Sequence, residues 1–292
     1  MKKITTLMMA FAVLLFAAQL TAGVEYKVDV KDYSTSTPET DETTVLADGK
    51  KLKMKAKKDA NDEMIFRGDK REMVVVDHKE KSYMVINKEV IAEMGKKMQA
   101  TVDQSMSQVN EALKNLPADK RAMVEKMMKE KMPNAGAAPP PPPTAGMAKF
   151  KSEFKNTGER GMQNGYSSIK YEVYRDGKKT HEHWVTSWDN IEGGEETAEI
   201  FQEMAAFFQE MMDAFSSSTG MGGMGNAPFQ MDENMFASLK SLEGFPVVTK
   251  DFANDGSLEG ESALRSATRR TIDPDEFEPP AGYRLRTMMD MR

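Results

Sequence analysis

The sequence predicts an α+β fold in which one antiparallel sheet is covered on one face by several α-helices. Segments with apolar residues at every second position form three groups along the chain. Two regions with apolar residues at every third or fourth position lie between these groups. Helices that fall between groups of strands, instead of following each strand, are typical of an antiparallel sheet and argue against a parallel αβ fold.

The first strand group extends to Ile86. "VEYKVDVKDY" places Tyr26, Val28 and Val30 on one face and charged residues on the other, which predicts a half-buried strand. Residues 63–86 predict three strands joined by two polar turns, an antiparallel meander. Residues 73–76 are apolar without alternation, which predicts that both faces of the sheet are covered there.

The stretch "KKLKMKAKK", residues 50–58, alternates lysines with Leu52, Met54 and Ala56. We expect an edge strand, because lysines at an edge discourage unwanted pairing. A basic binding patch is the alternative.

The first helical region runs from Val90 to Leu113, and Pro117 can open a second helix. Residues 133–147 follow, with five consecutive prolines and several Gly and Ala. Such a stretch predicts an extended, exposed insert inside the domain. Recognition by a proline-binding partner is the alternative.

The second strand group includes "KKTHEHWVTSW", residues 178–188, which follows a turn at Asp176-Gly177. Alternation places His181 and His183 on one face of this strand and both tryptophans on the other. A broad apolar helical face covers residues 200–215, and Asp232 can cap a further short helix. Two closing strands, at residues 244–252 and 257–272, and a proline-rich tail complete the chain.

The N-terminus has the pattern of a secretory signal peptide. Lys2 and Lys3 precede an apolar run from Leu7 to Leu20, and small residues then favour cleavage after Ala22. An uncleaved anchor is the alternative. We therefore expect residues 1–22 to be the signal peptide, and residues 23–292 to be a single α+β domain that is exported to the periplasm or secreted. After cleavage no stable membrane span is expected.

Composition excludes several classes of function. Loss of Lys2 and Lys3 moves the formal net charge from −6 to −8, and this acidity argues against nucleic acid and against docking on anionic lipid. The chain has no Cys, which excludes disulfides, thiolate catalysis and an N-terminal lipid on cysteine. No nucleophile elbow, phosphate-binding loop or metalloprotease motif is present, so we expect neither an enzyme nor a cofactor.

The histidine pair raises the alternative of a periplasmic metal protein. Imidazole binds copper and zinc, thioethers suit Cu(I), and twenty-three methionines remain after removal of Met1, Met8 and Met9 from the total of 26. That strand contains no methionine, however, and most methionines occur at helical spacing, where they serve as packing groups. A structural role for His181 and His183 is therefore the favoured interpretation.

The faces rich in Met and Phe carry the main functional hypothesis. The simplest interpretation is a core between helices and sheet. The alternative is an apolar cavity under a curved sheet, because Met and Phe can repack around varied apolar guests. Its lining would consist of Met204, Phe207, Phe208, Met211, Met235 and Phe236.

Several segments resemble the exported bacterial family known as domain of unknown function 4412. They are Gly165-Tyr166, Gly244-Phe245-Pro246, the hairpin "VVVDHKEKSYMVI" and the tail from Phe277 to Tyr283. The resemblance carries over no catalytic residue. The strand order of that family is similar to the LolA/LolB-type periplasmic lipoprotein carriers, which implies a curved, incomplete, half-barrel-like sheet around a lipid-binding cavity. The proline insert and the excess of methionine depart from this pattern.

The sequence thus predicts an exported, non-enzymatic protein of the cell envelope. A lipid or other apolar ligand between sheet and helices is the first hypothesis. The alternatives are the metal site at His181 and His183, and a structural protein that binds an envelope partner.

Overall fold

The computed structural model describes residues 22–58, 62–114, 152–219 and 244–287. In these residues twelve strands form one sheet, with the order β12-β6-β5-β4-β3-β2-β1-β11-β10-β9-β8-β7. All neighbouring strands are antiparallel except β12 and β6, and the sheet is open, with β12 and β7 at its two ends. The open antiparallel sheet predicted from the sequence is confirmed. The strands are β1 (Ala22–Asp32), β2 (Glu39–Asp48), β3 (Lys51–Ala56), β4 (Asp62–Arg67), β5 (Glu72–Asp77), β6 (Ser82–Ile86), β7 (Ser152–Gln163), β8 (Tyr166–Arg175), β9 (Lys178–Thr186), β10 (Phe245–Phe252), β11 (Leu258–Thr271) and β12 (Arg284–Leu285).

Tight turns set the register of the predicted hairpins. β4, β5 and β6 form the expected meander, and β8 meets β9 at the expected turn. Asp176 and Gly177 both have positive φ, 50° and 80°, as two-residue turns that follow the twist of the flanking strands require.

The prediction of an edge strand at the lysine-rich stretch is wrong. β3 lies inside the sheet, between β2 and β4. Its lysines are held by acidic neighbours: Lys53 Nζ lies 3.0 Å from Glu63 Oε1 and 2.7 Å from Glu276 Oε2. The cause of the error is β2, whose polar sequence "ETDETTVLAD" lacks the alternation that reveals a strand.

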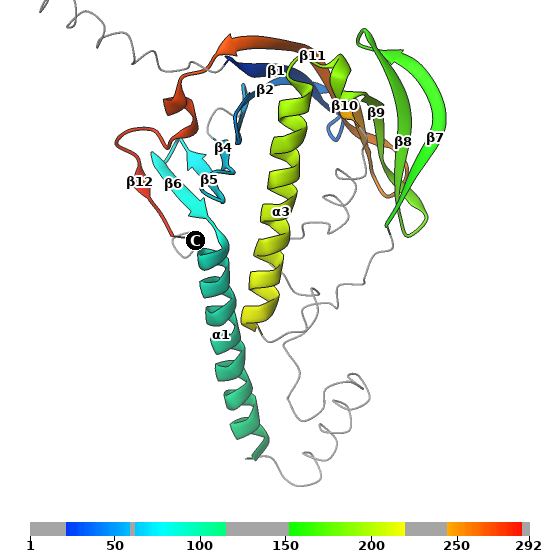
Figure 1. Cartoon of the computed structure of the whole chain (residues 1–292). Helices are drawn as coiled ribbons and strands as arrows, with labels where there is room; N and C mark the ends of the chain where they lie inside the picture. The colour runs from blue at the N-terminus through cyan, green and yellow to red at the C-terminus, as the bar shows by residue number, and fades with distance from the viewer. Residues whose placement is uncertain (1–21, 59–61, 115–151, 220–243, 288–292) are drawn as a thin grey trace, which may run out of the picture.

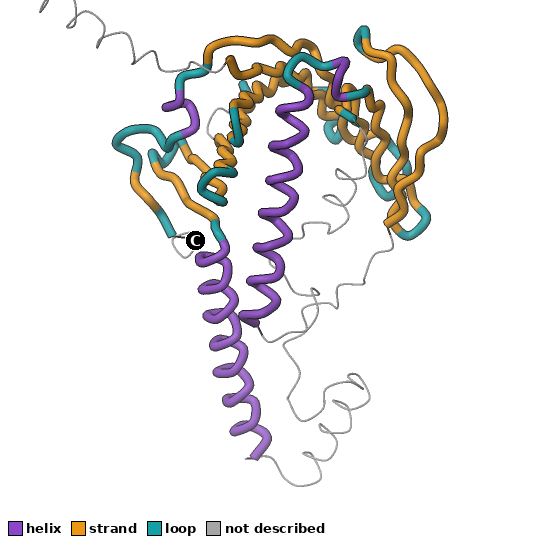
Figure 2. Tube along the Cα trace, viewed as in Figure 1, coloured by secondary structure: helices purple, strands orange, loops and turns teal. Residues whose placement is uncertain are grey.

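The sheet arches over helix α3 (Gly194–Thr219), and α1 (Lys88–Lys114) lies beside α3 and extends away from the sheet (Figure 1). Figure 2 shows the same arrangement, with the strands above and the two helices beneath them. The largest hydrophobic cluster fills the hollow between them. It joins α3 and the start of α1 to residues from both halves of the sheet, including Tyr26, Leu52, Phe66, Ile91, Trp184, Ile200, Phe207, Val247 and Leu264.

The outer face of β2 and β4–β6 is covered by the chain that follows β11. This C-terminal strap, residues 272–285, contains the short 3₁₀-helix η2 (Pro274–Phe277) and β12. Ile272 and Phe277 are both 1% exposed and form a second apolar cluster with Leu46, Ile65, Val74 and Val76. Both faces of β5 are therefore covered, as the continuous apolar run at residues 73–76 predicts.

Several predicted features lie outside the described residues. They are the helix after Pro117, the insert at 133–147, the short helix after Asp232 and all of the signal peptide except Ala22. The described part contains two α-helices, and neither is apolar enough over its length to cross a membrane.

Candidate functional site

Four of the six residues predicted to line an apolar cavity lie on one side of α3, inside the arch. Met204, Phe207, Phe208 and Met211 are all buried in the largest cluster. The ring of Phe207 lies 5.6 Å from that of Phe66 on β4, measured between centroids, and 5.4 Å from that of Phe208. These side chains therefore pack as core. Met235 and Phe236 lie outside the described residues.

The start of α3 is fixed to the middle of the sheet. The Tyr26 hydroxyl on β1 donates to the carbonyl oxygen of Glu192 at 3.1 Å and lies 2.6 Å from Thr197 Oγ1. Burial raises the pKa of Tyr26. Gly193 has a φ of +68°, and a Cβ there would lie 2.1 Å from Cγ2 of Val24. Only glycine permits this close approach of the helix to β1.

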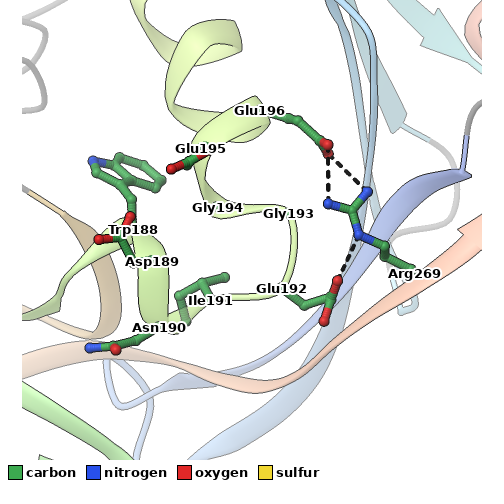
Figure 3. A pocket seen from close by; sticks show the side chains of 10 residues that line it. All are labelled: Trp188, Asp189, Asn190, Ile191, Glu192, Gly193, Gly194, Glu195, Glu196 and Arg269. Carbon is green, nitrogen blue, oxygen red and sulfur yellow. Dashed lines mark hydrogen bonds and ion pairs between the residues drawn. The ribbon is translucent and has the colours of Figure 1, made fainter.

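A polar pocket of about 430 Å³ lies beside this attachment (Figure 3). Its lining runs from Trp188 to Glu196 and includes Arg269 on β11. Arg269 Nε donates to Glu192 Oε1 at 2.6 Å, and Arg269 Nη2 donates to Glu196 Oε1 at 3.0 Å. The guanidinium is thus used to clamp the start of the helix. None of the four predicted cavity residues that the structure describes lines this pocket.

Further along α3, charged contacts join the helix to the turns on one side of the arch. Lys50, in the β2–β3 turn, forms an ion pair in which Nζ lies 2.9 Å from Glu203 Oε1. Arg71, in the β4–β5 turn, forms two ion pairs. Its Nη2 lies 2.6 Å from Glu210 Oε1, and its Nη1 lies 3.6 Å from Glu203 Oε2. The Lys50 ammonium lowers the pKa of Glu203.

Aromatic rings make the contact between α3 and the side of the arch that contains β10. Trp188, in the short turn after β9, packs 6.2 Å from the Phe201 ring on α3 and 5.7 Å from the Phe245 ring on β10. We call these three residues the aromatic seam. On the β2–β4 side α3 therefore has ion pairs in addition to the packing of Phe207 on Phe66, whereas the contacts of the aromatic seam lie on the β10 side.

The histidine pair lies on the face of β9 opposite Trp184, as alternation predicts. The two rings are parallel within 8°, with centroids 6.0 Å apart. His183 Nδ1 lies 3.0 Å from Thr249 Oγ1, and His181 Nε2 lies 3.7 Å from Asp251 Oδ1. Burial lowers the pKa of His183 to about 4, so this imidazole is neutral at pH 7.

On the opposite face of β9, Glu182 is 7% exposed and lies among lysines. Trp184 Nε1 donates to it at 3.2 Å, and Lys179 Nζ lies 3.1 Å away. Burial by itself would raise the pKa of Glu182, but the hydrogen bonds from Lys179 and Trp184 lower it overall.

Sequence patterns did not reveal the partners of these groups. Asp251 and Thr249 are on β10, and Arg269 is on β11, far along the chain from the residues they contact. Alternation gave the face of each side chain, but only the pairing of β9 with β10 places Asp251 directly opposite His181.

No protein-family model and no curated protein matches the chain. Solved structures that match include an uncharacterized conserved protein from Thermus thermophilus, with 6% identity, a TM-score of 0.40 and coverage of 91% of each chain. A MucA/MucB complex structure from Pseudomonas aeruginosa matches with 7% identity and a TM-score of 0.34, covering 90% of this chain and 58% of that one. At these scores the likenesses say nothing about function.

Proposed function

We propose that the chain is an exported, non-enzymatic protein of the cell envelope that binds an apolar ligand, such as an acyl chain, between the sheet and α3. The unequal attachment of α3 is the observation that carries this proposal. The start of the helix is clamped by Tyr26 and Arg269, and one side is tied by Lys50 and Arg71. The other side meets the sheet through the aromatic seam.

An apolar guest that enters at the seam replaces one set of apolar contacts with another. An aromatic pair contributes about 0.5–1.5 kcal/mol beyond its buried area, so parting the seam costs little once the guest covers the exposed rings. Met204 and Met211 lie on the buried side of α3. Unbranched methionine side chains adopt new rotamers readily and can reshape this surface around a chain of variable length.

Export is supported by the basic, apolar and small-residue pattern of residues 1–22. Membership of the domain of unknown function 4412 family is a proposal that rests on sequence resemblance, and the lipid-carrier analogy with LolA/LolB-type proteins is a fold-level analogy through that family. Both agree with an open antiparallel sheet that arches over a helix rich in Met and Phe.

Ligand binding can be tested with the mature chain, residues 23–292. We expect native mass spectrometry of gently purified protein to detect a co-purifying lipid. We also expect delipidated protein to take up a fluorescent fatty acid with a change in tryptophan emission, because Trp188 lies in the seam.

A matched pair of variants separates binding from stability. Phe207 and Phe277 are 2% and 1% exposed, but one faces the hollow of the arch and the other lies under the strap. Phe207→Leu is expected to weaken fatty-acid binding several-fold, whereas Phe277→Leu leaves the affinity of the folded protein unchanged. Protein that is reproducibly empty and takes up no fatty acid would contradict the proposal.

A further inference from the structure

We propose that His181, His183 and Asp251 form a binding site for a divalent transition-metal cation, with Zn²⁺ as the simplest case, on the outer face of β9 and β10. The site is separate from the hollow of the arch, because it lies on the face of β9 opposite Trp184. It does not depend on the proposed apolar ligand.

Strand register brings the three groups together. His181 and His183 alternate on β9 and therefore project from the same face. On β10, Asp251 pairs with His181 and Thr249 pairs with His183. Side chains directly opposite each other in an antiparallel pair have Cβ atoms about 4.5–5.5 Å apart. Two imidazoles and one carboxylate thus occupy three corners of one rectangle, with a hydroxyl at the fourth.

Distances show how far the groups must move. Zinc–nitrogen and zinc–oxygen bonds of about 2.0–2.2 Å in a tetrahedral site place ligand atoms about 3.3 Å apart. His181 Nε2 and Asp251 Oδ1 are already 3.7 Å apart. The His183 ring, 6.0 Å from the His181 ring, must rotate toward them. As the described side chains stand, no group of three or more His, Cys, Asp or Glu residues could hold a metal ion. The proposed site therefore requires rotation of the His183 ring, with the backbone register unchanged.

The neighbours of the two rings already supply outer-shell contacts. His183 Nδ1 lies 3.0 Å from Thr249 Oγ1, and His181 Nδ1 lies 3.0 Å from Thr180 Oγ1. A histidine held at one nitrogen by a hydrogen-bonding partner presents the other nitrogen to a metal. His181 is held at Nδ1 in this way and offers Nε2 to the ion, whereas rotation of the His183 ring changes its contact with Thr249.

Two of the three proposed ligands can be reached from solvent. The side chains of His181 and Asp251 are 35% and 50% exposed. Gly260 on β11 lies opposite Asp251, and a Cβ there would lie 3.1 Å from Asp251 Oδ2. Glycine therefore gives the carboxylate space to turn. On the other side of the pair, Tyr171 and Val185 form a small apolar cluster, which limits water around the imidazoles.

Calorimetric titration of the mature, tag-free chain with Zn²⁺ tests the proposal, with Co²⁺ absorption as a second readout of ligand geometry. We expect one ion per chain, with a visible Co²⁺ spectrum of a tetrahedral or five-coordinate site. His181→Gln, His183→Gln and Asp251→Asn should each weaken Zn²⁺ binding at least tenfold. His78→Gln is the matched control, because His78 is the third histidine and lies in the β5–β6 turn.

Three outcomes would contradict the proposed metal site. Absence of binding by the unmodified chain removes it outright. Loss of binding in His78→Gln, with binding retained in the other variants, places the ion elsewhere. Unchanged affinity in Asp251→Asn removes the carboxylate and with it the three-ligand assignment. Circular dichroism of every variant in the apo form separates loss of a ligand from loss of the fold.

Discussion

The two wings of the sheet differ in what covers them and in how they hold α3. The first wing, β2–β6 with β12, has the C-terminal strap on its outer face and ion pairs to α3 at its turns. The second wing, β7–β10, has a smaller outer cluster, the partly exposed histidine pair and an aromatic contact with α3. The first wing is supported from outside by the strap, whereas the aromatic seam and the proposed metal site both lie on the second wing.

Removing the side chain that anchors the strap should have the largest effect. Phe277→Ala deletes a ring that is 1% exposed between the strap and the first wing, and we expect a loss of about 3–5 kcal/mol in the free energy of unfolding. Urea denaturation measures this loss. Zn²⁺ affinity of the folded protein should not change, and a shared loss of both would show that the wings are not independent.

The same deletion in each wing compares their packing directly. Val76 on β5 is 0% exposed in the strap cluster, and Val185 on β9 is 5% exposed in the smaller outer cluster of the second wing. We expect Val76→Ala to cost about 2 kcal/mol and Val185→Ala about 1 kcal/mol, because Val185 packs in a smaller cluster with fewer buried neighbours and loses fewer buried contacts. Equal costs would remove the distinction in packing.

Acid should loosen the second wing through Glu182. Its pKa is lower in the folded chain than in the unfolded chain, so its contribution is fully present above the unfolded value near 4.5 and is lost as the pH falls through the folded value. We expect a smaller effect than those of the valine variants, seen as faster hydrogen exchange in β8 and β9 at acid pH. Glu182→Gln should abolish that part of the pH dependence.

The ion pairs between α3 and the first wing should contribute least to global stability. Arg71 and Glu210 are 44% and 47% exposed as side chains, and exposed pairs contribute about 0–1 kcal/mol. Arg71→Ala is therefore expected to shift the unfolding midpoint only slightly. Hydrogen exchange in the middle of α3 should rise, because the helix loses one of its lateral ties. An unchanged exchange rate there would show that the ion pairs do not fix the helix.

Periodicity was sufficient to predict much of the scaffold. The meander β4–β6, the hairpin β8–β9 and the helices α1 and α3 follow from alternation and from the helical repeat of Met and Phe. β2 was missed because seven of its ten residues are polar or acidic, and β3 was then wrongly placed at an edge. The composition of a single strand says little about its neighbours, because pairing partners are set by topology.

In the candidate sites too, local patterns predicted the face on which a side chain lies but not its partners from distant parts of the chain. Alternation correctly separated His181 and His183 from Trp184, although Trp188 lies beyond the end of β9, in the 3₁₀-helix of residues 188–190. Helical spacing placed Met204, Phe207, Phe208 and Met211 on one buried side. The nearness of Asp251 to His181, the clamp of Arg269 on Glu196 and the closure of the strap over Val74 depend on contacts between distant parts of the chain. No local pattern encodes such contacts.

The pairing of β1 with β11 has a consequence for the order of assembly. Tyr26 pairs with Ala267, so the strand made first lies in the middle of the sheet and needs one of the last strands to be made as its partner. The meander of the first wing can form from local contacts early, but the two wings cannot join until β11 arrives. During that interval one edge of β1 has no strand beside it and is open to the wrong neighbour. Slow delivery of residues 258–271, whether in synthesis or in export, should therefore favour aggregation.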